Sequence, residues 1–366
     1  MDLRLFQQKA IAALEARGIR GTVKAPTGSG KSMIAMHFVK KLNCTCLVIV
    51  PTIALQTQWI DELKALGIEC GRFGGGFRDQ TSILIGVRNS VIKIVFDVDL
   101  LILDECHRYQ SPQSIKPIFE MSKFKYIIAL SATPERLDDM HKVLFEVAPL
   151  VYTYSVDEAI EDDVISDYII DNHMIVMEEA EEIRYRLLDM KIREKFQKYG
   201  SFEQLRYAAM AGDFGAVHVM KAIAARKKII YNSISKVHYT VQLLKTIQKT
   251  IVFSESIEAL EQVKVLMPEC LIYHSGLTAI ERKQTIEMFK KSEKGVLLTA
   301  KSLDEGLNIV DISEAIIMSG TSTARQFTQR IGRTLRKHGD KIAKIHVIVL
   351  KDTKDEEWNA LAQSQS

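Results

Sequence analysis

APTGSGKS, at residues 25–32, is the most informative stretch of this sequence. It follows a short apolar run at residues 21–24 and precedes the helical pattern MIAMHFVKKL. Glycines let the backbone curl so that successive N–H groups and a helix N-terminus face phosphate oxygens. In such a loop Lys31 reaches the β- and γ-phosphates and the Ser32 hydroxyl ligates magnesium. The stretch therefore predicts a nucleotide-phosphate site between a strand and a helix of an α/β domain.

Short apolar runs recur along the chain in two series, with amphipathic stretches between them. Continuous rather than alternating hydrophobicity is typical of parallel strands covered on both faces, and the stretches between them supply helical crossovers. The first series lies at residues 21–24, 47–50, 83–86, 100–103 and 127–130, and the second at 251–253, 271–273, 296–299, 315–318 and 345–350. Both halves are thus predicted to be doubly wound α/β domains with parallel sheets.

The amino-acid composition changes between the two series of apolar runs. From about residue 177 to 245 the chain is charged, rich in helix formers and nearly free of strand-like runs. Opposite charges three and four residues apart favour exposed helix faces, so we predict a helical insert. The expected organisation is an ATP-binding domain at residues 1–160, a linker with the helical insert at 161–246, and a second α/β domain at 247–366.

Composition and charge exclude several classes of protein. The 366 residues include 49 Lys and Arg against 46 Asp and Glu, so the formal net charge is only +3. This excludes a highly basic packaging protein and still allows a local basic groove. No apolar run approaches the roughly 20 residues that cross a bilayer, and residues 1–10 lack a secretory pattern. Five scattered cysteines argue against a disulfide framework. We expect a soluble, cytoplasmic protein with no membrane contact.

A pair of acidic residues follows one of the predicted strands. LILDECHRYQ, residues 101–110, places Asp104 and Glu105 at the end of that strand, where ligands bind in α/β sheets. Asp104 suits a magnesium-organising carboxylate. Glu105 suits the base that orients and deprotonates an attacking water.

Arginines recur every third residue in the second half of the chain. QRIGRTLR, residues 329–336, places Arg333 and Arg336 on one face of a predicted helix. Planar guanidinium groups are well suited to charge that develops on a transferring γ-phosphate. Because these arginines belong to the second predicted domain, hydrolysis would depend on domain closure.

The order of these segments along the chain resembles that of superfamily-two helicases. The matching segments are LRLFQ (3–7), APTGSGKS (25–32), VPTIALQTQW (50–59), DECH (104–107), SAT (131–133), IVFSES (251–256), YHSGL (273–277), LLTAKSLDEGLN (297–308) and QRIGRTLR (329–336). FGGGF (73–77), LVYTYSVDEAIEDDVISDY (150–168) and LDEGLN are similar to the XPB/UvsW-like branch, whose members act on DNA. The resemblance implies two tandem RecA-like domains with a helical insert between them.

The resemblance also implies roles for individual residues. The ATP-binding set is Arg4, Gln7, Thr27, Gly28, Ser29, Gly30, Lys31, Ser32, Glu305 and Gly306. The catalytic set is Lys31, Asp104, Glu105, Gln329, Arg333 and Arg336, with Ser32 and Asp104 as the ligands of Mg²⁺. The coupling set between ATP hydrolysis and the grip on the strand is His107, Ser131 and Thr133. The expected nucleic-acid contacts are Thr52, Gln56, Arg88, Ser90, Ser254 and Thr299.

The favoured function is a helicase or translocase that uses ATP and Mg²⁺ and acts on single-stranded or branched DNA. One alternative is an RNA helicase of the DExH type, because the DECH box also occurs in RNA-acting relatives. Another is the motor subunit of a nuclease or repair complex. A non-catalytic nucleic-acid-binding scaffold is disfavoured because the phosphate loop and the arginines are intact. We expect a monomer with repair, replication or nuclease proteins as partners.

Several other features have a structural interpretation. FGGGF favours a tight hairpin, and Trp59 favours the core. The basic run at residues 226–228 is interpreted as a solvated helix face in preference to a path for a nucleic-acid strand. No metal-ligand spacing is visible for His37, His141, His173, His218, His238 and His346.

Overall fold

The computed structural model describes residues 2–109, 112–120, 122–135, 141–165, 167–300, 312, 314–319 and 342–364. Within them the chain divides into two compact units, with the boundary between Asp167 and Tyr168. Unit 1 comprises the described residues up to Asp167 together with Ile342, and unit 2 comprises 168–300, 312, 314–319 and 343–364. No helix in these ranges is both long and apolar enough to cross a membrane. The expected site residues outside the described ranges are Glu305, Gly306, Gln329, Arg333 and Arg336.

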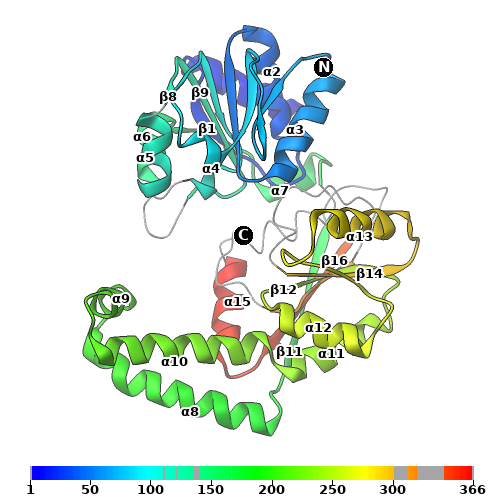
Figure 1. Cartoon of the computed structure of the whole chain (residues 1–366). Helices are drawn as coiled ribbons and strands as arrows, with labels where there is room; N and C mark the ends of the chain where they lie inside the picture. The colour runs from blue at the N-terminus through cyan, green and yellow to red at the C-terminus, as the bar shows by residue number, and fades with distance from the viewer. Residues whose placement is uncertain are drawn as a thin grey trace. The chain divides into compact units, whose positions relative to one another are not determined.

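Unit 1 is built on one eight-stranded sheet (Figure 1). Across the sheet the order is β10 (Leu150–Thr153), β1 (Arg20–Lys24), β9 (Tyr126–Ser131), β7 (Leu100–Leu103), β2 (Cys46–Val50), β5 (Ile83–Val87), β3 (Gly71–Gly74) and β4 (Phe77–Arg78). Every pairing is parallel except the β3–β4 hairpin. Strands β2 and β7 are buried at every position, as expected of strands covered on both faces. A separate two-stranded pair joins β6 (Phe96–Asp97) and β8 (Ser122–Lys123).

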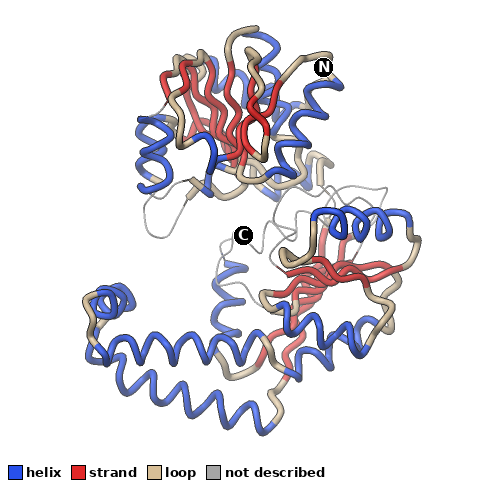
Figure 2. The backbone as a smooth tube through the Cα atoms, in the orientation of Figure 1, coloured by secondary structure: helices blue, strands red, loops and turns tan. Residues whose placement is uncertain are grey.

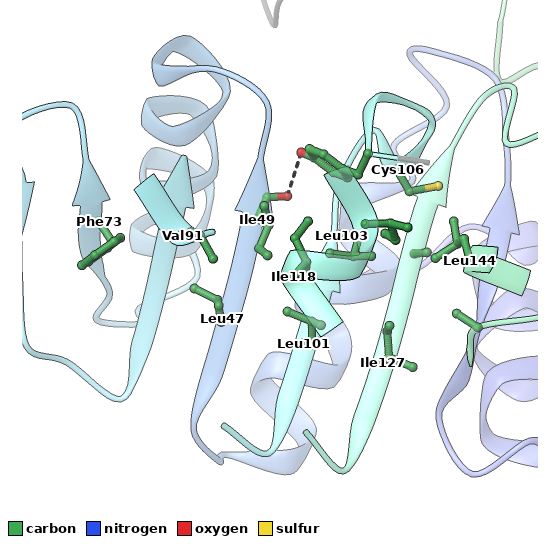
Figure 3. Packing of buried hydrophobic residues seen from close by; sticks show 14 residues of the cluster. Leu47, Ile49, Phe73, Val91, Leu101, Leu103, Cys106, Ile118, Ile127 and Leu144 are labelled. Atoms are coloured by element: carbon green, nitrogen blue, oxygen red, sulfur yellow. Dashed lines mark hydrogen bonds between the residues drawn. The ribbon is translucent and has the colours of Figure 1, made fainter. Parts of the chain in front are cut away.

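Helices cover both faces of this sheet (Figure 2). They are α1 (Leu5–Ala16), α2 (Ser32–Leu42), α3 (Ile53–Ala65), α4 (Arg88–Val91), α5 (Pro112–Glu120), α6 (Lys142–Val147) and α7 (Val156–Glu161), with a 3-10 turn at Cys106–Arg108. One hydrophobic cluster packs α4, α5 and α6 against β2, β7 and β9 through Val91, Ile118 and Leu144 (Figure 3). Tyr109 is buried in the same cluster and donates its hydroxyl proton to the Ile49 carbonyl at 3.3 Å. Burial of each large aliphatic side chain contributes roughly 1.5–3 kcal/mol.

Unit 2 contains a six-stranded sheet in which all pairings are parallel. The order is β11 (Tyr168–Ile175), β16 (Ala343–Leu350), β15 (Glu314–Ile317), β12 (Lys249–Ser254), β14 (Gly295–Ala300) and β13 (Leu271–Tyr273). Helices α11 (Ile234–Leu244) and α12 (Ile257–Leu266) pack on one face, and α13 (Ala279–Lys291) lies on the other (Figure 1). The predicted parallel α/β architecture is thereby confirmed in both units.

A fully buried ion pair fixes the last helix of unit 2, α15 (Lys354–Ser364). Lys236 Nζ on α11 lies 2.6 Å from Asp355 Oδ2, and both side chains have no exposed surface. Asp355 Oδ2 also accepts a hydrogen bond from the Leu350 N–H at 3.0 Å. The carboxylate therefore joins α11, β16 and α15.

Strand β11 differs from the sequence-based expectation, which placed residues 161–246 in a linker and insert. Instead β11 opens unit 2 and pairs with β16 along its whole length, from Tyr168 opposite Ala343 to Ile175 opposite Leu350. Its side chains are partly buried or exposed and none is fully buried, which fits a strand at the edge of the sheet. The segment YIIDNHMI consequently has no continuous apolar run that would mark it as a strand of a parallel sheet.

The helices expected in the insert follow β11 within unit 2. They are α8 (Glu179–Phe196), α9 (Phe202–Met210) and α10 (Phe214–Tyr231), with a 3-10 turn at Gln197–Tyr199. Helices α8 and α10 lie side by side and α9 sits at their far end (Figure 1). That end has a small core of its own, made of Tyr199, Leu205, Ala216 and Val219.

The basic run at residues 226–228 is engaged within unit 2. Arg226 is only 8% exposed and pairs with Asp189, so it belongs to the interior of the α8–α10 hairpin. Lys228 lies 3.2 Å from Glu258, and Lys227 lies over the Tyr231 ring at 5.1 Å. The expectation of a solvated helix face is therefore wrong for Arg226, because a buried carboxylate on the neighbouring helix requires a partner.

Candidate active site

The phosphate loop connects β1 to α2. Gly28 and Gly30 both have a φ of +88°, a left-handed conformation that glycine adopts without strain. The 11-residue helix α2 begins at Ser32, so the loop leads into a helix N-terminus, an arrangement that binds phosphate. The Thr27 hydroxyl is buried and has no hydrogen-bond partner within the described ranges. The loop therefore retains an unused polar group beside the helix N-terminus.

Helix α1 braces the loop from outside. Gln7 Nε2 donates to the Gly30 carbonyl at 2.9 Å, and Arg4 Nη1 donates to the Ser29 carbonyl at 3.2 Å. The Gln7 oxygen also accepts from the Arg4 backbone N–H at 2.9 Å. Both ends of the Gln7 amide are thus engaged. The structure brings Arg4 and Gln7, two of the residues expected to bind ATP, to the loop, where they hold its backbone in place.

The two acidic residues lie at the carboxyl end of β7, and one of them contacts the loop. Lys31 Nζ is 3.0 Å from Glu105 Oε1. Asp104 is only 5% exposed, and its Oδ2 accepts a hydrogen bond from Trp59 Nε1 at 2.7 Å. Burial, followed by the neighbouring Glu105 charge, raises the pKa of Asp104 to about 6, against the opposing influence of Lys31 and Trp59. A cation beside Asp104 would stabilise its charged form.

A third carboxylate, which no sequence motif marks, lies beside the expected magnesium ligand Ser32. Ser32 Oγ donates to Glu62 Oε2 at 3.3 Å, and Gln58 Nε2 donates to Glu62 Oε1 at 2.7 Å. Hydroxyl and carboxylate oxygens are the ligands that Mg²⁺ prefers. The donor set formed by Ser32 and Asp104 therefore fits this ion. Glu62 and Trp59 both come from α3, and their placement depends on which face of that helix meets the sheet.

The expected coupling residues are in contact with one another. His107 Nδ1 lies 2.9 Å from Ser131 Oγ and 3.4 Å from Glu105 Oε2. The Thr133 N–H donates to Ser131 Oγ at 3.0 Å. Glu105 has a φ of +48°, a left-handed conformation that is sparsely populated for residues with a side chain and is often found at functional sites. A chain of contacts thus runs from Lys31 through Glu105 and His107 to the end of β9.

Two of the expected nucleic-acid contacts lie at the start of α3 and differ in exposure. Thr52 is partly exposed and caps the helix by accepting from the Leu55 N–H at 3.3 Å. Gln56 is 1% exposed, and its Nε2 donates to the carbonyls of Phe73 at 3.1 Å and Ile85 at 2.7 Å. The expectation of a direct Gln56 contact is corrected accordingly. Its amide satisfies backbone carbonyls of β3 and β5 and ties α3 to the sheet.

The FGGGF segment forms the predicted tight hairpin, since β3 and β4 pair antiparallel with Gly74 opposite Phe77. A Cβ on Gly74 would lie 2.6 Å from Ser90 Oγ, so the hairpin packs closely on α4. Helix α4 also carries Arg88, and both Arg88 and Ser90 are partly buried. Three expected nucleic-acid contacts, including Thr52, therefore follow the carboxyl ends of β2 and β5.

The expected contacts in unit 2 are buried hydroxyls. Ser254 has no exposed surface, and its Oγ accepts from the Ser256 N–H at 3.0 Å and lies 3.3 Å from Ser319 Oγ. Ser254 therefore supports the loop after β12 in this conformation, which corrects the expectation of an exposed contact. Thr299 is 1% exposed, and its hydroxyl has no hydrogen-bond partner among the residues described.

Comparison with known proteins accords with this fold and site. Residues 1–136 match the family model described as type III restriction enzyme, res subunit, and residues 235–338 match the helicase conserved C-terminal domain. The chain is 31% identical over 371 residues to "DNA 3'-5' translocase XPB2" of Sulfurisphaera tokodaii, with 97% of this chain and 83% of the relative covered. It is 25% identical to "Putative DNA 3'-5' helicase Rad25" of Haloarcula marismortui, over 98% of this chain and 54% of the relative.

A third relative matches only part of the chain. "Putative ATP-dependent RNA helicase QP509L" of African swine fever virus (isolate Pig/Kenya/KEN-50/1950) is 38% identical over 132 residues, which is 32% of this chain and 26% of the relative. Among solved structures, the Pyrococcus furiosus Hef helicase domain has a TM-score of 0.62 and 14% identity, over 100% of this chain and 98% of that one. S. cerevisiae Dbp5 bound to RNA and ADP BeF3 has a TM-score of 0.66 and 16% identity, over 98% and 86%.

Two parallel-sheet units, a phosphate loop and a DECH box define a RecA-like helicase of superfamily two, an enzyme class that uses ATP. The chain belongs to the XPB-like branch of that superfamily.

Proposed function

We propose that this chain is a DNA helicase or translocase that couples ATP hydrolysis to strand separation or remodelling at forks, junctions and displacement loops. The observation that carries this proposal is the contact chain from Lys31 through Glu105 and His107 to Ser131. It links the phosphate loop to the loop after β9, so nucleotide binding or hydrolysis can change the conformation of that second loop. A DNA substrate is supported by the DNA 3'-5' translocase relative that spans most of the chain.

Nucleotide binding is proposed to change the partner of Lys31. In the structure Lys31 Nζ pairs with Glu105. The β- and γ-phosphates carry more negative charge than one carboxylate and would attract Lys31 away from it. Glu105, released from Lys31, would then orient water and accept its proton. Bound Mg²⁺ would neutralise charge on the phosphates, with Ser32 and Asp104 holding the ion.

The remaining site residues of the proposal come from both halves of the chain. Thr27, Gly28, Ser29 and Gly30 would bind phosphate oxygens, and Arg4 and Gln7 would meet the base. Glu305, Gly306, Gln329, Arg333 and Arg336, which lie outside the described ranges, would serve the nucleotide from the second half of the chain. Arginine at a γ-phosphate stabilises the charge that develops in the transition state.

The nucleic-acid strand is proposed to cross the carboxyl ends of β2 and β5. Thr52, Arg88 and Ser90 offer a hydroxyl, a guanidinium and a second hydroxyl to backbone phosphates there. In unit 2 the Thr299 hydroxyl, which has no hydrogen-bond partner among the described residues, is the matching candidate. Contacts to phosphates carry no sequence information and weaken as salt rises. Binding should therefore tolerate any sequence and fall steeply with ionic strength.

An RNA helicase is the second candidate. It is favoured by the partial match to the viral protein named as an RNA helicase. As partners we propose repair, replication or nuclease proteins, and we propose that the motor is a monomer.

The test is a panel of ATP hydrolysis and strand-separation assays on matched DNA and RNA substrates, each as single strand, blunt duplex, fork and four-way junction. We expect DNA to stimulate hydrolysis, with forks and junctions opened before blunt duplex. Stimulation by RNA alone would favour the second candidate. Hydrolysis that ignores every nucleic acid would overturn both.

A further inference from the structure

Four polar side chains gather on one face of the unit 2 sheet, away from the carboxyl ends of its inner strands. Asp171 and His173 are two residues apart on β11 and so point to the same face. His346 on β16 is paired in register with Asp171. Glu314 on the next strand, β15, completes the row across three adjacent strands.

The potential ligand atoms of three of these residues form a small triangle. His173 Nε2 and His346 Nδ1 are 2.8 Å apart. Asp171 Oδ2 lies 3.6 Å from His173 Nε2 and 3.9 Å from His346 Nδ1. In a tetrahedral zinc site with bonds of about 2.0–2.1 Å, two ligand atoms are about 3.3 Å apart. The mean edge of the observed triangle is close to that value, so small side-chain shifts would place all three atoms at bonding distance from one ion.

The outward-facing nitrogen of each imidazole already has a polar partner. His346 Nε2 lies 3.2 Å from Glu314 Oε2, and His173 Nδ1 lies 2.9 Å from the Tyr239 hydroxyl on α11. Metal-ligating histidines almost always have such a second partner, which fixes the ring and its tautomer. Glu314 would hold the His346 proton on Nε2 and leave Nδ1 with a lone pair.

We propose that His173, His346 and Asp171 bind a divalent transition-metal ion, with Zn²⁺ as the expected occupant and solvent in the fourth position. Two imidazoles and one carboxylate form a borderline nitrogen–oxygen set that suits Zn²⁺ better than Mg²⁺ or Ca²⁺. His173 and His346 are 15% and 6% exposed, whereas the Asp171 side chain is 39% exposed and leaves one side open to solvent. The ion would clamp the edge strand β11, which opens unit 2, to β16.

A neighbouring lysine, Lys344, would weaken metal binding at this site, and its removal provides a specific test. Lys344 Nζ lies 3.1 Å from Asp171 Oδ2, on an exposed side chain that can turn into solvent. A metal ion would compete with this lysine for the carboxylate. Removing the lysine charge should therefore strengthen metal binding, which no purely structural role of the cluster would produce.

The experiment titrates Zn²⁺ alone into the full chain after chelator treatment, with ATP and Mg²⁺ absent, and follows binding by calorimetry. Co²⁺ in a parallel titration reports four-coordinate geometry through its visible absorption. We expect one site in the wild type that is lost in His173→Gln and in His346→Gln. His218→Gln is the control, because His218 is exposed on α10. Tyr239→Phe should weaken binding roughly 10-fold through loss of the second partner, and Lys344→Gln should tighten it about fivefold.

Thermal unfolding of each variant in chelator checks that it still folds, and Asp171→Asn serves if a histidine variant does not. Saturating Zn²⁺ should raise the midpoint of the wild type by about 5 °C and leave His346→Gln unchanged. Equal Zn²⁺ affinity and stoichiometry in the wild type, His173→Gln and His346→Gln would overturn the proposal. So would the absence of any wild-type binding at a hundred-micromolar Zn²⁺ concentration.

Discussion

Units 1 and 2 share a parallel-sheet architecture but place different chemistry at the carboxyl ends of their strands. In unit 1 the ends of β1 and β7 carry Lys31, Asp104 and Glu105, which are charged and almost fully enclosed. In unit 2 the ends of β12 and β14 carry Ser254 and Thr299, which are neutral and buried. Among the residues described, the end of β7 in unit 1 therefore carries two neighbouring carboxylates beside a lysine, whereas the two hydroxyls named in unit 2 carry no charge.

The difference shows that the same parallel-sheet fold can carry different functional groups, and that the residues at the strand ends decide which chemistry is possible there. Burial raises the pKa of Asp104 to about 6 and places Lys31 against Glu105, so ligand binding in unit 1 is coupled to charge. Unit 2 holds charged groups elsewhere, in the buried Lys236–Asp355 pair and on the sheet face formed by β11, β16 and β15. A hydroxyl such as that of Ser254 can shape a loop but offers no charge to a phosphate.

The largest expected effect comes from the charged edge of unit 1. Lys31→Ala should lower kcat/KM for ATP by about 1,000-fold or more, because it removes the positive charge beside the phosphates. Lys24→Ala is the matched control, since Lys24 lies on the same strand-to-loop segment but pairs with exposed Glu135. Steady-state phosphate release measures both. Similar losses in the two variants would mean that the effect comes from the fold and not from the site.

The largest expected effect on stability lies in the interior of unit 2. Lys236→Met leaves the Asp355 carboxylate buried without its cation and should cost about 3–5 kcal/mol. The chain has two tryptophans, Trp59 in unit 1 and Trp358 in unit 2. In a Trp59→Phe background, Trp358 fluorescence therefore reports denaturant unfolding of unit 2. Lys236→Met together with Asp355→Asn should recover most of the loss, because the amide oxygen can still accept from the Leu350 N–H and no buried charge remains. Failure to recover would argue against an unpaired charge as its cause.

A smaller effect is expected on the pH dependence of hydrolysis. The charged form of Asp104 is the one that serves the metal, so kcat/KM should fall as the pH drops through about 6. Trp59 Nε1 donates to that carboxylate and stabilises its charged form. Trp59→Phe should therefore raise the pKa of Asp104 and move the acidic limb to higher pH. An acidic limb at the same pH in both proteins would contradict the assignment.

The smallest effects are expected from buried hydrogen bonds at the two edges. Gln56→Ala removes the buried amide that donates to the Phe73 and Ile85 carbonyls and should cost about 1–3 kcal/mol in unit 1. Ser254→Ala removes an acceptor from the Ser256 N–H and should cost about 1 kcal/mol in unit 2. Denaturant midpoints read at Trp59 and Trp358 separate the two units. A larger loss of unfolding free energy for Ser254→Ala than for Gln56→Ala would contradict this expected difference between the two units.

Much of unit 1 was predictable because its site residues are contiguous in the sequence. The phosphate loop lies within eight residues, and Asp104, Glu105 and His107 lie within four. Continuous apolar runs such as β2 and β7 also mark strands that are covered on both faces. The parallel α/β fold and the neighbourhood of Lys31 and Glu105 follow from these local patterns.

The contacts that could not be predicted from the sequence depend on which face of a helix or strand packs against its neighbours. No sequence motif marks Glu62 or Gln56, and their roles depend on how α3 packs on the sheet. There Glu62 accepts a hydrogen bond from Ser32, and Gln56 donates to backbone carbonyls of β3 and β5. Strand β11 lies at the edge of its sheet and has no fully buried residue. Its sequence therefore lacks the continuous apolar run that marks an inner strand and predicts a linker. His173 and His346 are 173 residues apart and meet only because β11 pairs with β16.

The most direct test of the central claim is ATP hydrolysis by wild type, Glu105→Gln and the matched control Glu135→Gln, measured with increasing forked DNA. We expect DNA to raise the wild-type and Glu135→Gln rates alike, while Glu105→Gln stays at background at every DNA concentration and still binds ATP. A Glu105→Gln protein that hydrolyses ATP at the wild-type rate, or a wild-type rate that forked DNA leaves unchanged, would contradict it.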